Sequence, residues 1–221
     1  MQRHFDEELK DLNNLILRMS ACAQEAIDRS IQALKERDRS LAQRVIDSDK
    51  DIDELELVID DKCLDLIALH QPMAGDLRFI MTGVKLNAEL ERIADIAVDI
   101  CERSLKLMDE PELKPLIDMP KLAQVAKNMV KESIDAFVSR DTELARNVLF
   151  SDALADNLRN AIQSELVEDY MVKNPSSCAR AVQLLLIARF FERICDHATN
   201  IAEDVFYMTE AKIVKHHPEN I

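Results

Sequence analysis

Four pairs of acidic residues, each spaced four positions apart, occupy matched places in the two halves of this sequence. On a helix, two residues at that spacing leave the same face one turn apart, so each pair presents two carboxylates side by side. Rows of carboxylate oxygens suit hard cations such as Mg²⁺, Ca²⁺, Mn²⁺ or iron. The pairs, with one further residue extending the second and the fourth, predict metal ligands at Asp49, Asp53, Glu91, Asp95, Asp99, Asp152, Asp156, Glu192, Asp196 and Asn200.

The acidic pairs in the second half of the chain repeat those in the first half. When residues 31–59 are aligned with residues 134–162, a shift of 103 positions, 12 of the 29 residues are identical. A shift of 101 positions aligns ERIADIAVDICE (91–102) with ERICDHATNIAE (192–203), and seven of twelve residues match. Packing explains the repeated apolar positions but not the repeated acids. The sequence therefore indicates a duplicated unit that carries the same carboxylate cluster twice.

Long amphipathic helices must position these acids. Apolar residues recur at alternating spacings of three and four, and the prolines fall between such stretches. With 2 glycines, no Trp and 4% aromatic residues, the composition favours helices over a many-stranded sheet. We predict an all-α fold of two tandem antiparallel three-helix bundles from an internal duplication, residues 1–110 and 111–221. The predicted helices are 5–37, 39–70, 73–108, 121–139, 141–173 and 176–214, with a proline-rich linker at 109–120.

The short proline turns between helices fix which acids face each other. Helices joined by a short turn are antiparallel neighbours, so residues equally distant from the turn lie at the same height. Asp49 and Asp95 are both 23 residues from position 72, and Asp53 and Glu91 are both 19 residues from it. The four acids of the second half are related in the same way about position 174. Level carboxylates repel unless their pKa values rise, basic groups pair with them or a cation binds, and we favour the cation because the arrangement occurs twice.

A competing interpretation places these acids on a solvated helix face. There they would pair with basic neighbours, for which Arg92, Arg193, Lys50 and Arg44 are the candidates. The adjacent His197 is expected to form an interhelical hydrogen bond rather than to bind a metal. The five cysteines are odd in number and include no C-x-x-C pair, which is typical of reduced thiols in a reducing compartment.

The charge of the chain excludes several kinds of partner. A formal net charge of -14 argues against nucleic acid and anionic lipid as partners.

The N-terminal MQRHFDEELKDL has no apolar core of the kind found in signal peptides. The most apolar stretch, 181–191, is interrupted by Gln183 and Arg189 and is shorter than the ~20 residues of a membrane span. We expect a cytoplasmic protein that meets a membrane only through its partners.

The two repeated motifs resemble those of a known family. ERIADIAVDI and ERICDHATNI, one in each half, are similar to the E(D)-x-x-x-D motifs of the PhoU family, as are the tandem three-helix layout, the other acidic pairs and the length. The resemblance covers nearly the whole chain. It implies a non-enzymatic regulator of phosphate uptake and signalling. Such a protein is an adaptor between the phosphate ABC transporter (its ATPase and permease) and its sensor histidine kinase, and it represses the phosphate-starvation response when phosphate is ample.

The resemblance also implies a multinuclear metal cluster on each motif. Iron is the expected metal, with Mn, Mg, Ca or Zn as alternatives. Asn200 departs from its counterpart Asp99, so the resemblance does not imply equal metal load or charge in the two halves. The implied ligands are Glu91, Asp95 and Asp99 with Asp49 and Asp53, then Glu192 and Asp196 with Asp152 and Asp156.

Two other functions compete with a regulatory adaptor. A di-metal carboxylate oxidase in a helical bundle uses Glu-x-x-His repeats. None of the five histidines has a glutamate three residues before it, which argues against that enzyme. The other alternative is a metal-free helical scaffold whose acids only confer solubility.

One helix carries more apolar surface than a single stripe can bury. Residues 181–188 are almost all apolar, and Phe190 and Phe191 follow them. The excess could pack on the other bundle, on the membrane-bound transporter or on a second copy of the chain. We expect a homodimer, because twofold self-association is the commonest way to cover such a surface.

Overall fold

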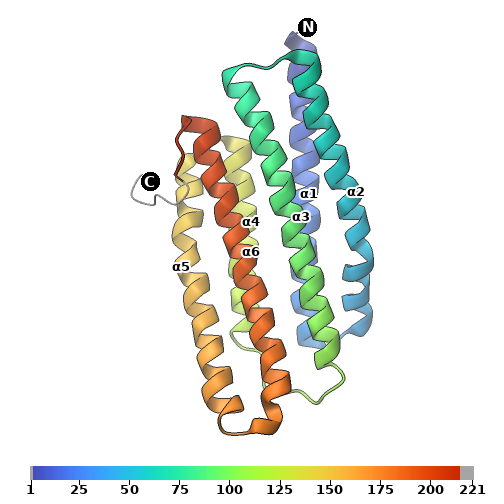
Figure 1. The fold of residues 1–221 in the computed structure, drawn as a ribbon, viewed down its shortest axis with the longest axis vertical. Coiled ribbons are helices and arrows are strands. Elements are labelled where there is room, and N and C mark those ends of the chain that lie inside the picture. Colours follow the sequence, from blue (N-terminus) through green and yellow to red (C-terminus); the bar gives the residue numbers. More distant parts are fainter. Residues whose placement is uncertain (1, 215–221) are drawn as a thin grey trace.

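The computed structural model describes residues 2–214, which form six long helices and no strand (Figure 1). Residues 215–221, which include Pro218 and the end of the predicted second bundle, lie outside the described residues. The all-α prediction is confirmed. The first four helices begin and end within three residues of their predicted positions. The helices are α1 (Gln2–Glu36), α2 (Arg39–His70), α3 (Ala74–Leu107), α4 (Met119–Ser139), α5 (Thr142–Glu165) and α6 (Cys178–Glu210).

In each bundle, the turn between the first and second helices is formed by an arginine followed by an aspartate. Arg37 and Arg140 adopt left-handed backbone conformations, with φ of 55° and 56°. The following Asp38 caps α2, its Oδ1 accepting the Leu41 N–H at 2.9 Å, and Asp141 caps α5 in the same manner. Such a cap satisfies a backbone N–H that has no partner within its helix. Since the two turns are 103 residues apart, the duplication predicted from sequence is also a repetition of backbone geometry.

The end of α5 differs from the prediction of one helix over 141–173. The α-helix ends at Glu165, and a π-helical turn follows at Leu166–Met171. In that turn the Val172 N–H donates to the Val167 carbonyl oxygen at 3.0 Å. Apolar spacing does not distinguish an α-turn from a π-turn over so short a segment, so the sequence pattern could not reveal the change.

The last helix is also shorter than the predicted 176–214. A 3-10 turn at Pro175–Ser177 precedes it, and it ends at Glu210. Ala211 adopts a left-handed conformation with φ of 55°, and its N–H donates to the Tyr207 carbonyl oxygen at 3.0 Å. That geometry closes the helix.

The six helices form two three-helix bundles that pack side by side (Figure 1). Helices α1, α2 and α3 contact one another, as do α4, α5 and α6, while α3 packs on α6 and α1 on α4. Buried apolar side chains from all six helices form one large core, and a second, smaller cluster comes from α1, α2 and α3. Phe79 of α3 stacks on Phe137 of α4 with ring centroids 5.0 Å apart, so the core crosses from one bundle to the other. The domain boundary at 110/111 remains a prediction.

The apolar run on α6 is covered within the chain. Helix α6 packs against α3, α4 and α5, so it has neighbours on three sides. Ala181, Leu184, Ile187 and Phe191 are buried, whereas Val182 is 42% exposed. Packing within the chain, which includes the contact with the first bundle through α3, therefore buries much of the apolar run. This run no longer supplies a reason to expect a homodimer.

The proline-rich connection is held against both bundles. Arg37 Nη2 donates to the carbonyl oxygens of Leu107 at 3.2 Å and Glu110 at 2.6 Å. Lys114 is buried and pairs with Glu165 of α5.

Over residues 2–214, no helix combines the length and the apolar character that a membrane span requires.

Candidate metal centre

The first candidate centre lies along the groove between α2 and α3. Asp49 and Asp53 project from the middle of α2, whose buried residues Val45, Ile52 and Leu55 hold that helix against the core. Asp49 is half-buried at the edge of the core, whereas Asp53 is exposed. The acids therefore lie where the packed face of the helix meets solvent, and a cation could reach them there.

Charge repulsion crosses this groove. Burial raises the pKa of Asp49 to about 6, and the charges of Asp53 and of Asp95 on α3 add to the effect. Burial raises the pKa of Glu91 to about 7, with further repulsion from Asp95 and from Glu56 on α2. The acids of α2 thus act on those of α3, as the predicted antiparallel register requires. Both carboxylates favour protonation or a compensating positive charge.

Glu56 belongs to this groove although it was not predicted as a site residue. Burial raises the pKa of its carboxyl group, and the charges of Asp60 and Asp53 add to that effect. Glu56 lies three residues after Asp53, on the same face of α2. That spacing could have identified it, but recurrence in both halves excluded it, because its counterpart in the second half is Arg159.

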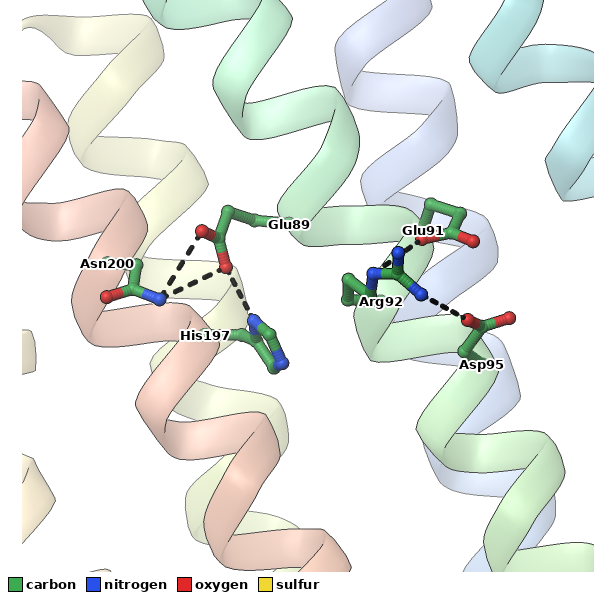
Figure 2. Close-up of polar contacts among 6 residues, drawn as sticks. All are labelled: Glu89, Glu91, Arg92, Asp95, His197 and Asn200. Atoms are coloured by element: carbon green, nitrogen blue, oxygen red, sulfur yellow. Dashed lines mark hydrogen bonds and ion pairs between the residues drawn. The ribbon is translucent and has the colours of Figure 1, made fainter.

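Arg92 supplies part of the compensating charge, as the competing interpretation expected. Its Nε lies 3.5 Å from Glu91 Oε2, and its Nη1 lies 3.2 Å from Asp95 Oδ2 (Figure 2). The Arg92 side chain is 62% exposed, so these pairs are weak and the guanidinium group can move aside. Arg44, another candidate partner, donates to Ser40 instead.

The second candidate centre lies between α5 and α6. Burial raises the pKa of Asp152, and Asp156 and Asp196 add repulsion. Burial also raises the pKa of Glu192, with repulsion from Asp196 and Asp156 opposed by Arg189 and Arg159. Because Asp152 and Asp156 are on α5 and the other two acids are on α6, the four carboxylates interact across the groove.

Glu192 is the most buried of the predicted ligands, at 5% exposed. Its Oε1 accepts a hydrogen bond from Arg189 Nη1 at 2.5 Å and lies 3.5 Å from Arg159 Nη2. Its Oε2 is buried and, within residues 2–214, has no hydrogen-bond partner. Arg159 and Arg189 were not predicted as site residues, and neither has an arginine counterpart in the first half.

Cys195 lies among the acids of the second centre but remains a thiol. Burial raises its pKa, and the charges of Asp152, Asp196 and Glu192 raise it further. A thiolate is therefore disfavoured at this position, in agreement with the prediction of a buried, reduced cysteine.

The last two predicted ligands lie near the contact between the bundles. Asn200 Nδ2 is 3.3 Å from both carboxylate oxygens of Glu89 on α3, and His197 Nδ1 is 2.5 Å from Glu89 Oε2 (Figure 2). The prediction that His197 forms an interhelical hydrogen bond is confirmed. Asp99 is half-buried, and Arg193 of α6 attracts it across the same contact. Asn200 is thus engaged with Glu89 of the other bundle.

The donor set of both grooves fits a hard cation, because all the grouped ligands are carboxylate oxygens and Glu192 Oε2 has no partner. Among residues 2–214, however, no three His, Cys, Asp or Glu side chains converge closely enough to hold a metal ion. A bound ion would therefore require carboxylates on facing helices to turn toward it from these positions.

The raised pKa values predict how the stability of the metal-free protein depends on pH. A carboxyl group whose pKa is higher in the folded than in the unfolded state binds its proton more tightly when folded. Burial of the charged Glu91 carboxylate, with repulsion from its acidic neighbours, therefore destabilises the metal-free fold increasingly between about pH 4.5 and pH 7 and fully above pH 7. In chelator, Glu91→Gln should raise the melting temperature at pH 8 by about 2–4 °C for each kcal/mol of repulsion removed.

The same substitution should have much less effect at pH 4.5, where Glu91 is protonated in the folded state and about half protonated in the unfolded state. Thermal melts followed by circular dichroism at several pH values measure this. Glu36→Gln, at the exposed end of α1, is the control for loss of one carboxylate elsewhere. Equal shifts for Glu91→Gln at pH 8 and pH 4.5 would show that repulsion in the groove is not the cause.

Comparison with known proteins identifies the family. A model described as the PhoU domain matches the chain twice, over residues 16–104 and 119–205. The chain is 40% identical to a phosphate-specific transport system accessory protein PhoU homolog of Aquifex aeolicus, covering 95% of each protein. It is 34% identical to a homolog with the same name from Clostridium acetobutylicum, covering 95% of this chain and 96% of that one.

Solved structures agree with this assignment. The fold matches the crystal structure of PhoU from Pseudomonas aeruginosa with a TM-score of 0.89 and 33% identity, covering 94% of this chain and all of that one. It matches the phosphate transport system regulatory protein PhoU from Streptococcus pneumoniae with a TM-score of 0.89 and 25% identity, covering 96% and 99% of the two chains. The two matched PhoU domains coincide with the two helical bundles and their acidic grooves, so this chain belongs to the PhoU family.

Proposed function

We propose that this protein is a cytoplasmic regulator of phosphate uptake and signalling. In this role it is an adaptor between the phosphate ABC transporter and its sensor histidine kinase, and it represses the phosphate-starvation response when phosphate is ample. The function is non-catalytic. The observation that supports it most strongly is the full-length relationship to proteins named as accessory or regulatory components of phosphate transport.

The proposed function includes metal binding in both grooves. Glu91, Asp95 and Asp99 with Asp49 and Asp53 would hold the metal between α2 and α3. Iron is the first candidate, with Mn, Mg, Ca or Zn as alternatives. Bound metal would supply the positive charge that cancels the repulsion between facing carboxylates and so would tie the two helices of each groove together. In the second groove the ligands would be Glu192 and Asp196 with Asp152 and Asp156.

Co-purification tests the adaptor role. The full chain, affinity-tagged and expressed in its host in high phosphate, should retain both the sensor kinase and the ATPase or permease of the transporter. An unrelated acidic helical protein with the same tag is the control for adhesion by charge alone. Recovery of neither partner, from membranes solubilised so that both are present in the extract, would contradict the adaptor role.

We retain a homodimer as part of this proposal, now on the basis of surface apolar residues. Leu57 and Leu64 on α2 are each 64% exposed, and Phe150 and Leu154 on α5 are 71% and 53% exposed. A second copy could cover these positions. Light scattering at micromolar concentration should give twice the chain mass. A mass near 25.2 kDa at every concentration would rule the dimer out.

A further inference from the structure

The internal duplication allows the two grooves to be compared position by position. The acidic pairs are the same in both halves, but several neighbouring positions differ in charge, and three of them are compared first. Glu56 on α2 corresponds to Arg159 on α5, Ala88 on α3 corresponds to Arg189 on α6, and Asp99 corresponds to Asn200. Every one of these differences makes the second groove less negative than the first.

In the second groove, Arg159 and Arg189 already contact the predicted metal ligand Glu192. Arg159 Nη2 lies 3.5 Å from Glu192 Oε1 and 3.4 Å from Asp156 Oδ1, and Arg189 Nη1 donates to the same Glu192 oxygen at 2.5 Å. The Arg159 side chain is only 23% exposed, so solvent screens its charge less than it screens that of Arg92. Two guanidinium groups thus offset four carboxylates before any ion binds.

In the first groove one exposed arginine faces a longer acidic row. Arg92 is 62% exposed and contacts two of the acids. Arg193 does not distinguish the grooves, because it attracts both Asp99 and Asp196. The acids of this row are Asp49, Asp53, Glu56, Glu91, Asp95 and Asp99.

A buried amide extends the first groove by another turn. Asn87 is fully buried, and its Nδ2 donates to the Glu56 carbonyl oxygen at 2.8 Å and to Asp60 Oδ1 at 3.0 Å. Its Oδ1 is buried and has no hydrogen-bond partner in the described part of the chain. A carbonyl oxygen left in this state beside carboxylates suits a hard cation. The counterparts of Asn87 and Asp60 in the second half are Ala188 and Gln163, so this extension occurs in the first groove alone.

We propose that the two grooves bind cations unequally. The α2–α3 groove takes more divalent ions and binds them more tightly, with Glu56 as an additional ligand. In the α5–α6 groove, Arg159 and Arg189 supply positive charge that bound ions supply in the first groove. This inference rests on the proposed metal binding. It adds a prediction of which groove binds the metal more tightly.

Titration with Mn²⁺ tests the inequality without any assay of regulation. The metal-free full chain is titrated, and free Mn²⁺ is counted by electron paramagnetic resonance. Wild type should show a tight and a weak class of site. Asp49→Asn with Asp53→Asn should abolish the tight class, and Asp152→Asn with Asp156→Asn should abolish only the weak class.

Reciprocal charge exchange then tests the cause. Glu56→Arg should weaken the tight class about tenfold or more, and Arg159→Glu should strengthen the weak class by a similar factor. Lys131→Glu, at an exposed position on α4, is the control for the change in net charge made by Arg159→Glu. Glu56→Gln and Arg159→Gln should give smaller shifts in the same directions, and they serve if either reversal impairs folding.

The outcomes separate this inference from the proposed function. Equal Mn²⁺ affinity and stoichiometry in the two grooves, unchanged by Arg159→Glu or Arg159→Gln, would overturn the inequality and leave metal binding intact. Tighter binding in the α5–α6 groove would also overturn it. Absence of Mn²⁺ binding in both grooves of wild type would overturn the inference together with the metal binding on which it rests.

Discussion

Deletion of this protein from its host should switch on phosphate-starvation genes in high-phosphate medium. If the chain favours the repressing state of its kinase when phosphate is ample, its removal lets the activating state dominate. Regulatory coupling energies are typically ~1–3 kcal/mol, so a reporter of a starvation promoter should rise about tenfold or more. The measurement is reporter activity in high phosphate, with and without the gene.

Complementation supplies the controls for this experiment. The wild-type chain should restore repression, and a chain with both carboxylate rows disabled should restore it only in part. A variant carrying Glu36→Gln, outside both grooves, should behave as wild type. Normal repression in the deletion strain would contradict the regulatory role.

Asp95→Ala combined with Asp196→Ala should sharply lower the metal content of protein purified without chelator. Each substitution removes a carboxylate that faces the other helix of its groove. Loss of one charge from a cation site costs roughly 1–4 kcal/mol between fully aqueous and partly buried environments, which is about tenfold or more in affinity. Elemental analysis measures the effect directly.

A matched variant controls for the loss of two negative charges. Asp28→Ala with Asp135→Ala removes acids from α1 and α4, outside both grooves. Its metal content should equal that of wild type. If the Asp95→Ala, Asp196→Ala variant also retains the wild-type content, the ligand assignment is wrong.

Features set by neighbouring residues along the chain were predictable from sequence. The helix predicted over 39–70 has those bounds in the structure, because Asp38 caps its first turn and the proline at position 72 disrupts a helix interior. The facing of Asp49 and Asp95 followed from equal distances to the proline turn. Periodicity and hairpin geometry therefore determined the fold and the height of the acidic rows.

Features set by contacts between bundles were not predictable in the same way. The register of α3 against α6, which brings His197 and Asn200 to Glu89, is not fixed by either hairpin turn. The arginines on Glu192 were missed because long flexible side chains find partners only in the packed structure. Glu56 was missed for a different reason: recurrence in both halves was the criterion, and it excludes the positions at which the halves differ.

The covering of α6 shows the same limit. Sequence identified residues 181–191 as too apolar for one stripe but could not decide what would cover them. Packing of α6 on α3 of the first bundle and on α4 and α5 of its own bundle now accounts for the burial of Ala181, Leu184 and Ile187. Only the arrangement of the two bundles could distinguish this from a dimer interface.

The most direct test of the metal-binding account is a crystal structure of the full chain grown with Mn²⁺, with an anomalous difference map. Metal binding in the grooves predicts peaks within about 2–2.5 Å of the carboxylate oxygens of Asp49, Asp95 or Glu91. The unequal charges further predict fewer or weaker peaks between α5 and α6. A map at saturating Mn²⁺ with no peak in either groove would contradict the account.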